Sequence, residues 1–331
     1  MASSQSRPKW DIHADGSPFE EDMSGVGEEF EVDPSVIANL PKGCSFVKAQ
    51  SFKASRWARI AKITTRLEDG SETHFFMKVS AGDSGRAMLR GEYEGMLAIH
   101  DTVPDFAPKP IAWGEFRDEP GTYFFICEFI EMKEGELPPV NEFCRQLAKL
   151  HRESVSPTGK FGFDVVTCNG ATPQTVDWED SWEVFFSRGL RHMLELDLKV
   201  NGPQPELVTA ITPVFDVVIP RLLPPLQQGP RQIRPSLVHG DMWWGNSALN
   251  RKTGMPVVFD AAAFYAHNEY DMGNWRPRRS RFGKEYFEAY RKEYPPAHPE
   301  QDYEDRILLY SMRFDFQLSI LFPGSTNEKK V

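Results

Sequence analysis

The sequence is poor in cysteine and has no excess of positive charge, and each absence excludes a class of function. Its four cysteines include no C-x-x-C pair, which argues against a disulfide framework and against a cysteine-based metal site. The formal net charge is −10, whereas a protein that binds a nucleic-acid backbone needs a basic face. We therefore expect no nucleic-acid partner and a reducing, cytoplasmic location.

Long hydrophobic runs are missing as well. Residues 1–32 contain no apolar stretch of the signal-peptide type. The longest apolar region that the pattern suggests, 256–266, is interrupted by Asp260 and is too short to span a bilayer, so no membrane partner is expected. The composition, 40% hydrophobic and 26% charged, is that of a folded chain, and the length of 331 residues favours two domains or lobes. No feature indicates an oligomeric state.

Hydrophobic periodicity divides the chain into a β-rich part and a helical part. Residues 1–30 are polar and acidic and are expected to form a tail. Residues 31–130 predict an N-lobe with strands at 58–67, 73–79, 111–116 and 122–130 and one helix at 84–100. Residues 131–139 predict a connector. Residues 140–331 predict a C-lobe with short strands within 236–260 and helices at 140–151, 182–198, 207–223, 282–294 and 302–321. The pattern is that of an α+β fold.

The strongest chemical signal lies in residues 238–246, VHGDMWWGN. Asp241 and Asn246 are five residues apart in a polar loop that follows an apolar strand. Phosphoryl transfer to a hydroxyl group needs a carboxylate that orients the hydroxyl and accepts its proton, and it needs a metal ligand nearby. An Asp-x-x-x-x-Asn loop supplies both groups from one short segment.

A second carboxylate follows at the end of the next apolar strands. Asp260 lies fourteen residues after Asn246, and a carboxylate in this position can hold Mg²⁺ against the phosphates of ATP. The intervening hairpin has the length needed to bring Asn246 and Asp260 side by side.

Two residues of the β-rich part complete the pattern. Lys78 ends an apolar strand and can contact the α- and β-phosphates of ATP, while Glu92 in the following helix can hold the lysine in place. Glu94 is an alternative to Glu92 that helical phase does not eliminate. The order Lys, Glu, Asp, Asn, Asp is the order of the protein-kinase-like fold. Each residue alone has a bland alternative as a solvated charge or a turn residue, and the five together favour the functional interpretation.

The loop His239–Asn246 resembles the H-G-D-x-x-x-x-N loop of kinase-like phosphotransferases, among them aminoglycoside and choline kinases. Other segments between Phe75 and Pro323 resemble the fructosamine/ketosamine 3-kinase family more specifically. These segments are 143–151 (FCRQLAKLH), 161–164 (FGFD), 169–174 (NGATPQ), the aromatic residues Trp178, Trp182, Phe185 and Phe186, 259–271 (FDAAAFYAHNEYD) and 286–290 (YFEAY).

The resemblance implies a protein-kinase-like fold with a small β-rich N-lobe, a mostly helical C-lobe, and ATP bound at the connector near Glu128 and Ile130. It also implies roles for single residues. Asp241 would be the catalytic base, Asn246 and Asp260 the Mg²⁺ ligands, Lys78 the phosphate contact, and Asp271 a support behind the catalytic loop. His239 is expected to hold the loop backbone rather than to move protons.

The acceptor that the resemblance implies is the 3-hydroxyl of a 1-amino-2-ketose, such as a fructosamine or ribulosamine, carried by a protein lysine or a free amine. A phosphate at C3 would become a leaving group once the C1–C2 enaminol forms. The adduct would then fall apart and release the amine. The implied activity is therefore deglycation that uses ATP and Mg²⁺.

Some features depart from the family pattern. Residues 50–57 (QSFKASRW) lie where a phosphate-covering loop is expected and contain no glycine, which keeps open a non-catalytic nucleotide-binding scaffold. Trp244 stands where a small residue is common, and Ala261 where many members have proline, which keeps open another hydroxylated amine as the acceptor. Trp243 and Trp244 are the candidates for acceptor contact. The basic run 276–281 (RPRRSR) is expected to be a solvated loop near the active-site mouth.

Overall fold

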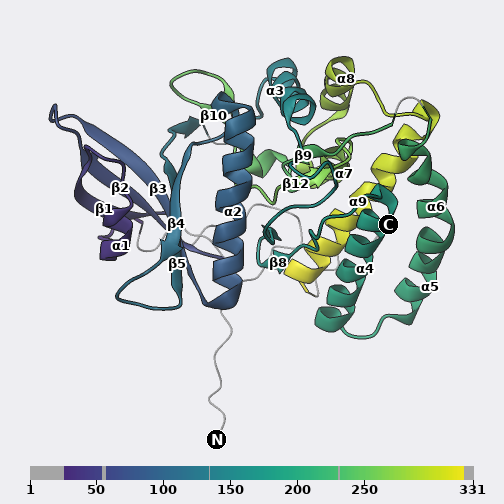
Figure 1. The fold of residues 1–331 in the computed structure, drawn as a ribbon, viewed down its shortest axis with the longest axis horizontal. Helices are drawn as coiled ribbons and strands as arrows, with labels where there is room; N and C mark the ends of the chain where they lie inside the picture. The colour runs from purple at the N-terminus through teal and green to yellow at the C-terminus, as the bar shows by residue number, and fades with distance from the viewer. Residues whose placement is uncertain (1–25, 54–56, 134, 230–231, 324–331) are drawn as a thin grey trace, which may run out of the picture.

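The computed structural model has two lobes, and one long helix, α2, lies between the sheet of the N-lobe and the C-lobe (Figure 1). It describes residues 26–53, 57–133, 135–229 and 232–323. The N-lobe is a five-stranded antiparallel sheet in the order β1-β2-β3-β5-β4. Most of the C-lobe is helical, and the predicted α+β two-lobed fold is confirmed. The N-lobe elements are α1 (Pro34–Ala38), β1 (Ser45–Lys53), β2 (Arg59–Arg66), β3 (Glu72–Ala81), α2 (Gly82–Thr102), β4 (Pro110–Glu115) and β5 (Thr122–Glu128).

The N-lobe sheet has one strand more than the sequence pattern indicates. Strand β1 pairs with β2 along the edge of the sheet. Beyond it, the segment before residue 31 is attached to this edge, because the amide of Gly27 donates to the carbonyl of Ser51 over 2.7 Å. Phe30 is buried in the same core as Ile63 and Met77. Residues 1–25 of the expected tail lie outside the described residues.

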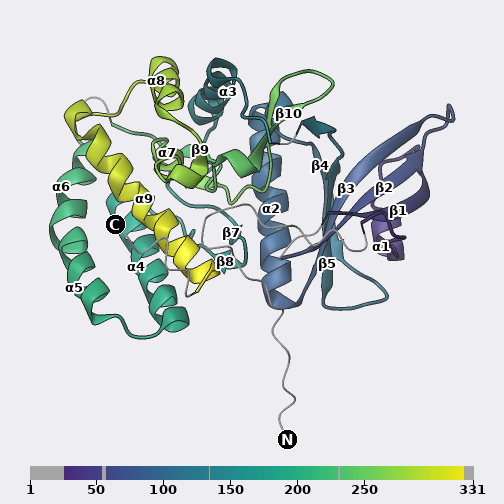
Figure 2. The same cartoon turned by 180° about the vertical axis from the view of Figure 1, so that it is seen from behind.

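Helix α2 lies between the sheet and the C-lobe, as both views of the ribbon show (Figures 1 and 2). Two glycines on it permit a close approach to the C-lobe. A Cβ atom at Gly91 would lie 2.4 Å from the carbonyl oxygen of Val166, and one at Gly95 would lie 3.1 Å from Cβ of Ala263. Helix α2 is therefore packed against C-lobe backbone at a distance that a larger side chain would prevent.

The C-lobe contains short strands near the site and helices around them. Strand β10 pairs with β11 and β6, and β12 pairs with β9. The elements are β6 (Met132–Lys133), α3 (Val140–Glu153), β7 (Cys168–Asn169), β8 (Thr172–Pro173), α4 (Trp182–Asn201), α5 (Pro205–Pro213), α6 (Ile219–Leu222), β9 (Ser236–Val238), β10 (Ser247–Asn250), β11 (Pro256–Val258), β12 (Phe264–Ala266), α7 (Tyr270–Gly273), α8 (Lys284–Glu293) and α9 (Tyr303–Leu321).

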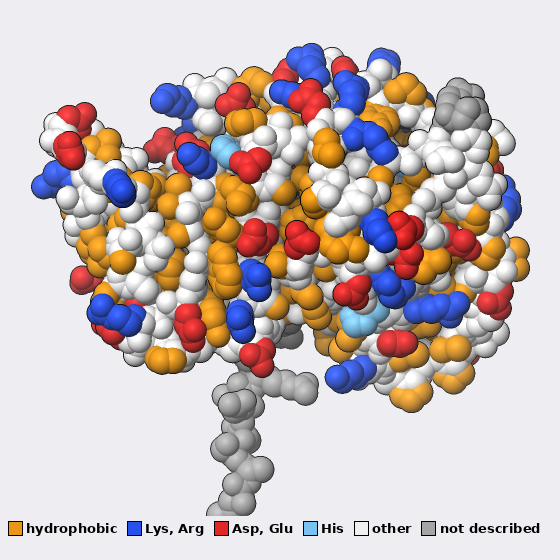
Figure 3. Space-filling model, in the orientation of Figure 1, with side chains coloured by type: hydrophobic (Ala, Val, Ile, Leu, Met, Phe, Trp, Pro, Cys, Tyr) orange, Lys and Arg blue, Asp and Glu red, His pale blue; other side chains and the backbone are white. Residues whose placement is uncertain are grey.

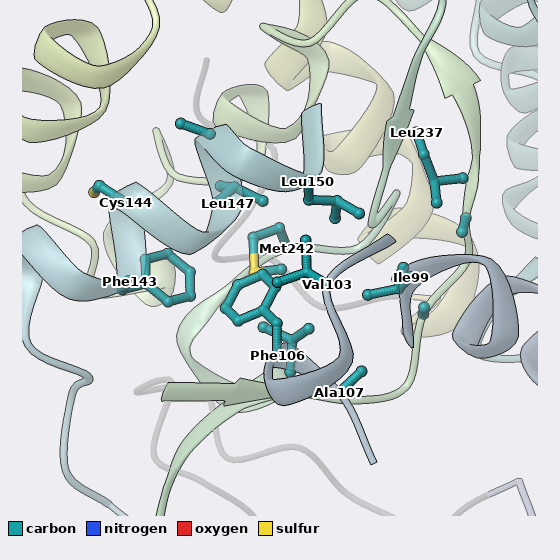
Figure 4. Packing of buried hydrophobic residues seen from close by; sticks show 14 of the residues in the cluster. Ile99, Val103, Phe106, Ala107, Phe143, Cys144, Leu147, Leu150, Leu237 and Met242 are labelled. Carbon is teal, nitrogen blue, oxygen red and sulfur yellow. The ribbon is translucent and has the colours of Figure 1, made fainter. Parts of the chain in front are cut away.

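The main core of the C-lobe lies directly under the catalytic motif. Figure 4 shows Met242, which follows Asp241, among buried side chains of α3 and of the segment after α2. Met242 is fully buried, so the residue next to the predicted base is anchored in the core. The labelled neighbours are Ile99, Val103, Phe106, Ala107, Phe143, Cys144, Leu147, Leu150 and Leu237.

The stretch expected as a helix at 207–223 is helical, with an irregular middle. It consists of α5, a π-helical turn (Val214–Val218) and α6 in direct succession. Proline explains the irregularity, because Pro213 and Pro220 lack the amide that a regular helical hydrogen bond needs. Pro205–Gln227 is long and apolar enough to cross a membrane by length and composition, so it replaces 256–266 as the longest apolar stretch. In the fold its buried residues, including Ile211 and Leu222, pack in a core shared with α4 and α9.

Charged side chains of both signs are interleaved on the face shown in Figure 3. Lysine and arginine alternate there with aspartate and glutamate, and no single sign covers the face. This distribution agrees with the overall charge of −10, and it favours neither a nucleic-acid nor a membrane surface on that side. The absence of both kinds of partner stays a prediction.

Candidate active site

The structure brings Lys78, Glu92 and Asp260 together between the lobes. Lys78 Nζ lies 2.7 Å and 2.9 Å from the two carboxylate oxygens of Glu92 and 2.6 Å from Oδ1 of Asp260. The lysine comes from β3 and the glutamate from α2, whereas Asp260 follows β11 in the C-lobe. Glu92, and not Glu94, is therefore the partner of the lysine.

Burial and charge act in opposite directions on this cluster. Lys78 and Glu92 are each only 8% exposed. Burial disfavours the charged lysine, but the carboxylates of Asp260 and Glu92 outweigh it and raise the pKa of Lys78. Burial also raises the pKa of Glu92 to about 7, and the lysine opposes that rise. The lysine is therefore the group that keeps its charge, and it is available as a fixed cation for a phosphate.

Asp260, whose side chain contacts this lysine, has an unusual backbone conformation. Its φ is 59°, in the left-handed region that residues other than glycine seldom adopt. Its side chain is 47% exposed, so one oxygen pairs with Lys78 while the carboxylate stays accessible from solvent. A hard, accessible carboxylate of this kind suits Mg²⁺.

The predicted hairpin is confirmed and places Asn246 next to Asp260. Ser247 of β10 pairs with Val258 of β11, and the amide of Phe259 donates to the carbonyl of Asn246 over 3.1 Å. Asn246 Nδ2 donates to the carbonyl of Asp241 over 2.9 Å. Because this bond uses the amide nitrogen, the amide oxygen of Asn246 remains as a potential metal ligand.

Near its start the loop needs a glycine, because a residue with a side chain would not fit at position 240. Gly240 has φ 78°, and a Cβ there would lie 2.1 Å from the carbonyl oxygen of Ala262. The loop therefore touches the backbone that follows Asp260. This contact explains sterically why glycine stands between His239 and Asp241.

Asp271 supports the loop from behind, in the position that the sequence predicts. Its two oxygens accept from the amides of His239, over 2.8 Å, and Gly240, over 2.9 Å. His151 Nε2 lies 3.1 Å from the same carboxylate, and its Nδ1 lies 2.6 Å from the hydroxyl of Tyr290. All of these contacts are buried, so the backbone before Asp241 is fixed.

His239 holds backbone on both sides of its ring. Its Nε2 lies 2.9 Å from the carbonyl of Phe259, and its Nδ1 lies 3.3 Å from the amide of Asp241. The partners assign the tautomer, because a carbonyl needs a donor and an amide needs an acceptor. Burial lowers the pKa of His239, in agreement with a neutral ring that links the two carboxylate-bearing loops.

The sequence analysis missed a polar network between α9 and the site. Arg313 donates to Asn169 over 2.8 Å and to Gln174 over 3.0 Å. Those amides in turn donate to the carbonyls of Gly240, over 3.1 Å, and Ala262, over 2.8 Å. Asn169 and Gln174 belong to segment 169–174, one of those that resemble the fructosamine/ketosamine 3-kinase family. For Arg313 the sequence offers one signal, a charged residue on the buried face of the helix at 302–321.

The side chain of Asp241 is partly buried and hydrogen-bonded. Asn274 Nδ2 donates to its Oδ1 over 3.0 Å. Burial raises the pKa of Asp241, whereas His239, Arg279, Arg313 and a hydrogen bond from Gln317 oppose the rise. The donors and cations keep the carboxylate ionised, and burial raises its affinity for a proton, so it is suited to accept one from a substrate hydroxyl.

The two tryptophans of the loop are partly exposed, and Trp244 also packs against the main core. The rings of Trp243 and Trp244 meet edge to face with centroids 5.9 Å apart. Trp243 folds over Gly245, where a Cβ would lie 2.5 Å from its ring. The guanidinium of Arg281 lies 4.4 Å from the ring centre of Trp244, so part of the basic run 276–281 contacts the loop.

The predicted nucleotide-binding edge is formed by β5 and the residues after it. Glu128 ends β5, is exposed, and pairs with Phe75, with Ile130 two residues farther on. Of the segment 50–57, the first four residues belong to β1, residues 54–56 lie outside the described residues, and Trp57 lies against Gly170. Within the described ranges no group of three His, Cys, Asp or Glu forms a metal cluster.

Comparison with known proteins shows which family has a similar sequence. A sequence profile of the fructosamine kinase family matches residues 47–330. The chloroplastic protein-ribulosamine 3-kinase of Arabidopsis thaliana is 32% identical over 244 residues, which cover 71% of this chain and 68% of that protein. The ketosamine-3-kinase of Mus musculus is 29% identical over 294 residues, with 82% and 88% covered.

A solved structure agrees with the fold. A candidate fructosamine-3-kinase from Thermobifida fusca superposes with a TM-score of 0.69 at 20% identity, covering 88% of this chain and 93% of the other. This likeness establishes the two-lobed kinase-like fold, and the match over residues 47–330 establishes the family. The chain belongs to the fructosamine kinase family.

Proposed function

We propose that this protein transfers the γ-phosphoryl group of ATP to the 3-hydroxyl of a ketosamine, carried by a protein lysine or a small amine. The observation that carries the proposal is the assembled set of Lys78, Asp241, Asn246 and Asp260, in a chain of the fructosamine kinase family. The names of the relatives, ketosamine-3-kinase and protein-ribulosamine 3-kinase, support this acceptor class.

The nucleotide is proposed to lie between the lobes. Its adenine would meet the backbone near Glu128 and Ile130, and its phosphates would meet Lys78, which Glu92 holds from the other side. The oxygens of Asn246 and Asp260 fit a hard cation, and Mg²⁺ bound there would neutralise phosphate charge. The Lys78–Asp260 contact then loosens as phosphate oxygens take over the lysine.

The transfer needs one proton acceptor, and Asp241 supplies it. The acceptor hydroxyl gives its proton to the carboxylate of Asp241 as its oxygen bonds to the γ-phosphorus. The bond from that phosphorus to the oxygen it shares with the β-phosphate breaks, and ADP leaves. In the product the phosphate at C3 stands next to the C2 ketone, so enaminol formation across C1–C2 expels it and leads to release of the amine.

The test is turnover with defined acceptors. ADP release is measured with Mg·ATP and fructosyl-lysine or ribulosyl-lysine, with aminoglycosides and choline as the competing classes, and NMR locates the phosphate on the product. We expect stimulation by a ketosamine, phosphate at C3, and loss of turnover in Asp241→Asn. Stimulation only by an aminoglycoside or choline would assign another acceptor, and ATP binding without any turnover would indicate a scaffold. The cytoplasmic location stays a prediction.

A further inference from the structure

We propose that Asn274 is a positioning residue for the catalytic base: it holds Oδ1 of Asp241 and so fixes the orientation in which the carboxylate meets the acceptor hydroxyl, and Arg279 fixes the orientation of the Asn274 amide. The proposal rests on the proposed function, because it assigns Asp241 as the base. Neither Asn274 nor Arg279 carries a role in the sequence analysis, and the basic run that contains Arg279 was expected only to be solvated.

Asn274 follows directly after α7 and is 2% exposed. The same short helix carries Asp271, whose oxygens accept from the amides of His239 and Gly240. Asn274 lies one helical turn farther on and donates to the side chain of Asp241 over 3.0 Å. The helix α7 thus holds the backbone before the base through Asp271, and the residue directly after it, Asn274, holds the side chain of the base.

The neighbours decide which way the Asn274 amide points. Both terminal nitrogens of Arg279 lie 3.4 Å from Asn274 Oδ1. A guanidinium only donates hydrogen bonds, and an ionised carboxylate only accepts them. In the opposite orientation the amide oxygen would face the Asp241 carboxylate and the NH₂ group would face the guanidinium, which is unfavourable on both sides. Arg279 therefore selects the orientation in which Asn274 donates to Asp241.

A carboxylate that is held in one orientation can present a lone pair to the substrate. Oδ1 of Asp241 accepts from Asn274, and a hydrogen bond from Gln317 also reaches the carboxylate. Together these bonds restrain rotation about the bond to the carboxyl group, and a carboxylate can accept further hydrogen bonds, among them the one from the acceptor hydroxyl. Proton and phosphoryl transfer depend on such alignment, and a displacement of about 1 Å can lower a rate roughly 100-fold. Loss of Asn274 should therefore lower kcat while the groups that bind ATP and the acceptor remain.

The test is a double-mutant cycle on kcat. Asn274→Ala is expected to lower kcat about 100-fold, with KM for the acceptor and Kd for Mg·ATP within about twofold. Arg279→Met should lower kcat about 10-fold, because the amide is then free to flip, and Arg279→Lys should restore most of the rate, since lysine is also only a donor. The loss caused by Arg279→Met should be smaller in the Asn274→Ala background than in the wild type, because part of the effect of Arg279 passes through Asn274 and only its direct charge effect on Asp241 remains.

Arg276→Met is the matched control. Arg276 is exposed in the same segment and has the same charge, and the structure gives it no hydrogen bond to Asn274, so its removal should leave kcat unchanged within about twofold. If Asn274→Ala does not fold, Asn274→Ser makes the same test with a smaller cavity. Full kcat in a folded Asn274 variant, or additive losses in the double variant, would overturn the proposal.

Turnover by the wild-type protein tests the proposed function separately from the positioning role of Asn274. If the wild type shows no turnover with any ketosamine, the proposed function fails, and crystal structures then test the positioning. Rotation of the Asp241 carboxylate in Asn274→Ala, relative to the wild type, supports the proposal. An unchanged carboxylate would contradict it. If the wild type turns over and the Asn274 variants match it, only the positioning role is lost.

Discussion

On the N-lobe side of the site a lysine lies between two carboxylates, whereas on the C-lobe side the proposed base, Asp241, lies in a loop that is held mostly through its backbone. Lys78 pairs with Glu92 and Asp260. The loop around Asp241 is instead held at the amides of His239 and Gly240 by Asp271.

The two arrangements respond differently to a ligand. An ion pair can exchange one partner for another of the same charge, so phosphate oxygens can replace Asp260 at the lysine. Backbone hydrogen bonds that are buried have no such substitute, because water does not reach them. The N-lobe side is therefore suited to rearrange as ATP binds, while the C-lobe side stays fixed and keeps the base aligned.

The largest effect is expected from the base itself. Asp241→Asn removes the proton acceptor and leaves the shape and the surrounding bonds, so kcat should fall about 1,000-fold. Thermal stability and Mg·ATP binding in calorimetry should stay close to wild type. Near-normal turnover would mean that the base is another residue, and the C-lobe side would then lose its assigned role.

The next effect tests the backbone support on the C-lobe side. Asp271→Ala leaves two buried amides without an acceptor and is expected to lower the free energy of unfolding by about 3 kcal/mol, as measured by urea denaturation. Asp197→Ala is the control, because Asp197 is also buried but accepts from Asn201 and Gln204 instead. Asp197→Ala should lose stability and retain its kcat, whereas Asp271→Ala should also lower kcat. Equal kcat in the two variants would contradict the support role of Asp271.

On the N-lobe side, Asp260→Ala should weaken Mg·ATP binding about 100-fold, because it removes the accessible carboxylate proposed to hold the metal. Isothermal calorimetry at fixed free Mg²⁺ measures the change, and binding of metal-free nucleotide is the comparison. Unchanged affinity for Mg·ATP would place the metal elsewhere.

Lys78→Met should reduce kcat by about 50-fold, because the phosphates lose a fixed cation. The variant should still fold, since methionine fills a buried position without charge, although Glu92 is then left without its cation. Glu92→Gln in the same background should restore stability to thermal unfolding and not restore turnover. A mild effect of Lys78→Met on kcat would contradict a phosphate contact at this strand.

The smallest effect is expected at Trp244, one of the two tryptophans of the loop. Trp244→Ser removes a ring that packs against Trp243 and Arg281 and should change the acceptor KM about 10-fold, with kcat within about twofold. Comparison of fructosyl-lysine with a glycated peptide shows whether the ring limits acceptor size. If KM is unchanged for both acceptors, Trp244 does not line the acceptor site.

Local motifs could be predicted from the sequence because their parts are close along the chain. The hairpin from Asn246 to Asp260 and the strand ending near Lys78 follow from alternation and turn residues. The sequence also indicated Asp271 through the family resemblance. In each case the residue lies in a short segment whose own pattern is distinctive.

Contacts between distant segments could not be predicted in this way. Arg313 and Asn169 are 144 residues apart, and no local period reports that they meet. Asn274 lies three residues after Asp271 and has the same burial, but which side chain it reaches depends on how α7 packs behind the loop. The helix at 207–223 followed from its apolar spacing, but the π-helical turn at Val214–Val218 did not, because apolar spacing does not report where the prolines disturb the hydrogen bonds.

The close packing of α2 has a consequence for control of the activity. In many kinases the helix that carries the glutamate partner of the lysine moves, and its position switches the enzyme on and off. Here Gly91 sets that helix against the backbone at Val166, and in this position Glu92 is paired with Lys78. A swing of α2 would break this contact with the C-lobe. A switch that moves this helix would therefore have to separate the lobes at Gly91 as well as part Glu92 from Lys78.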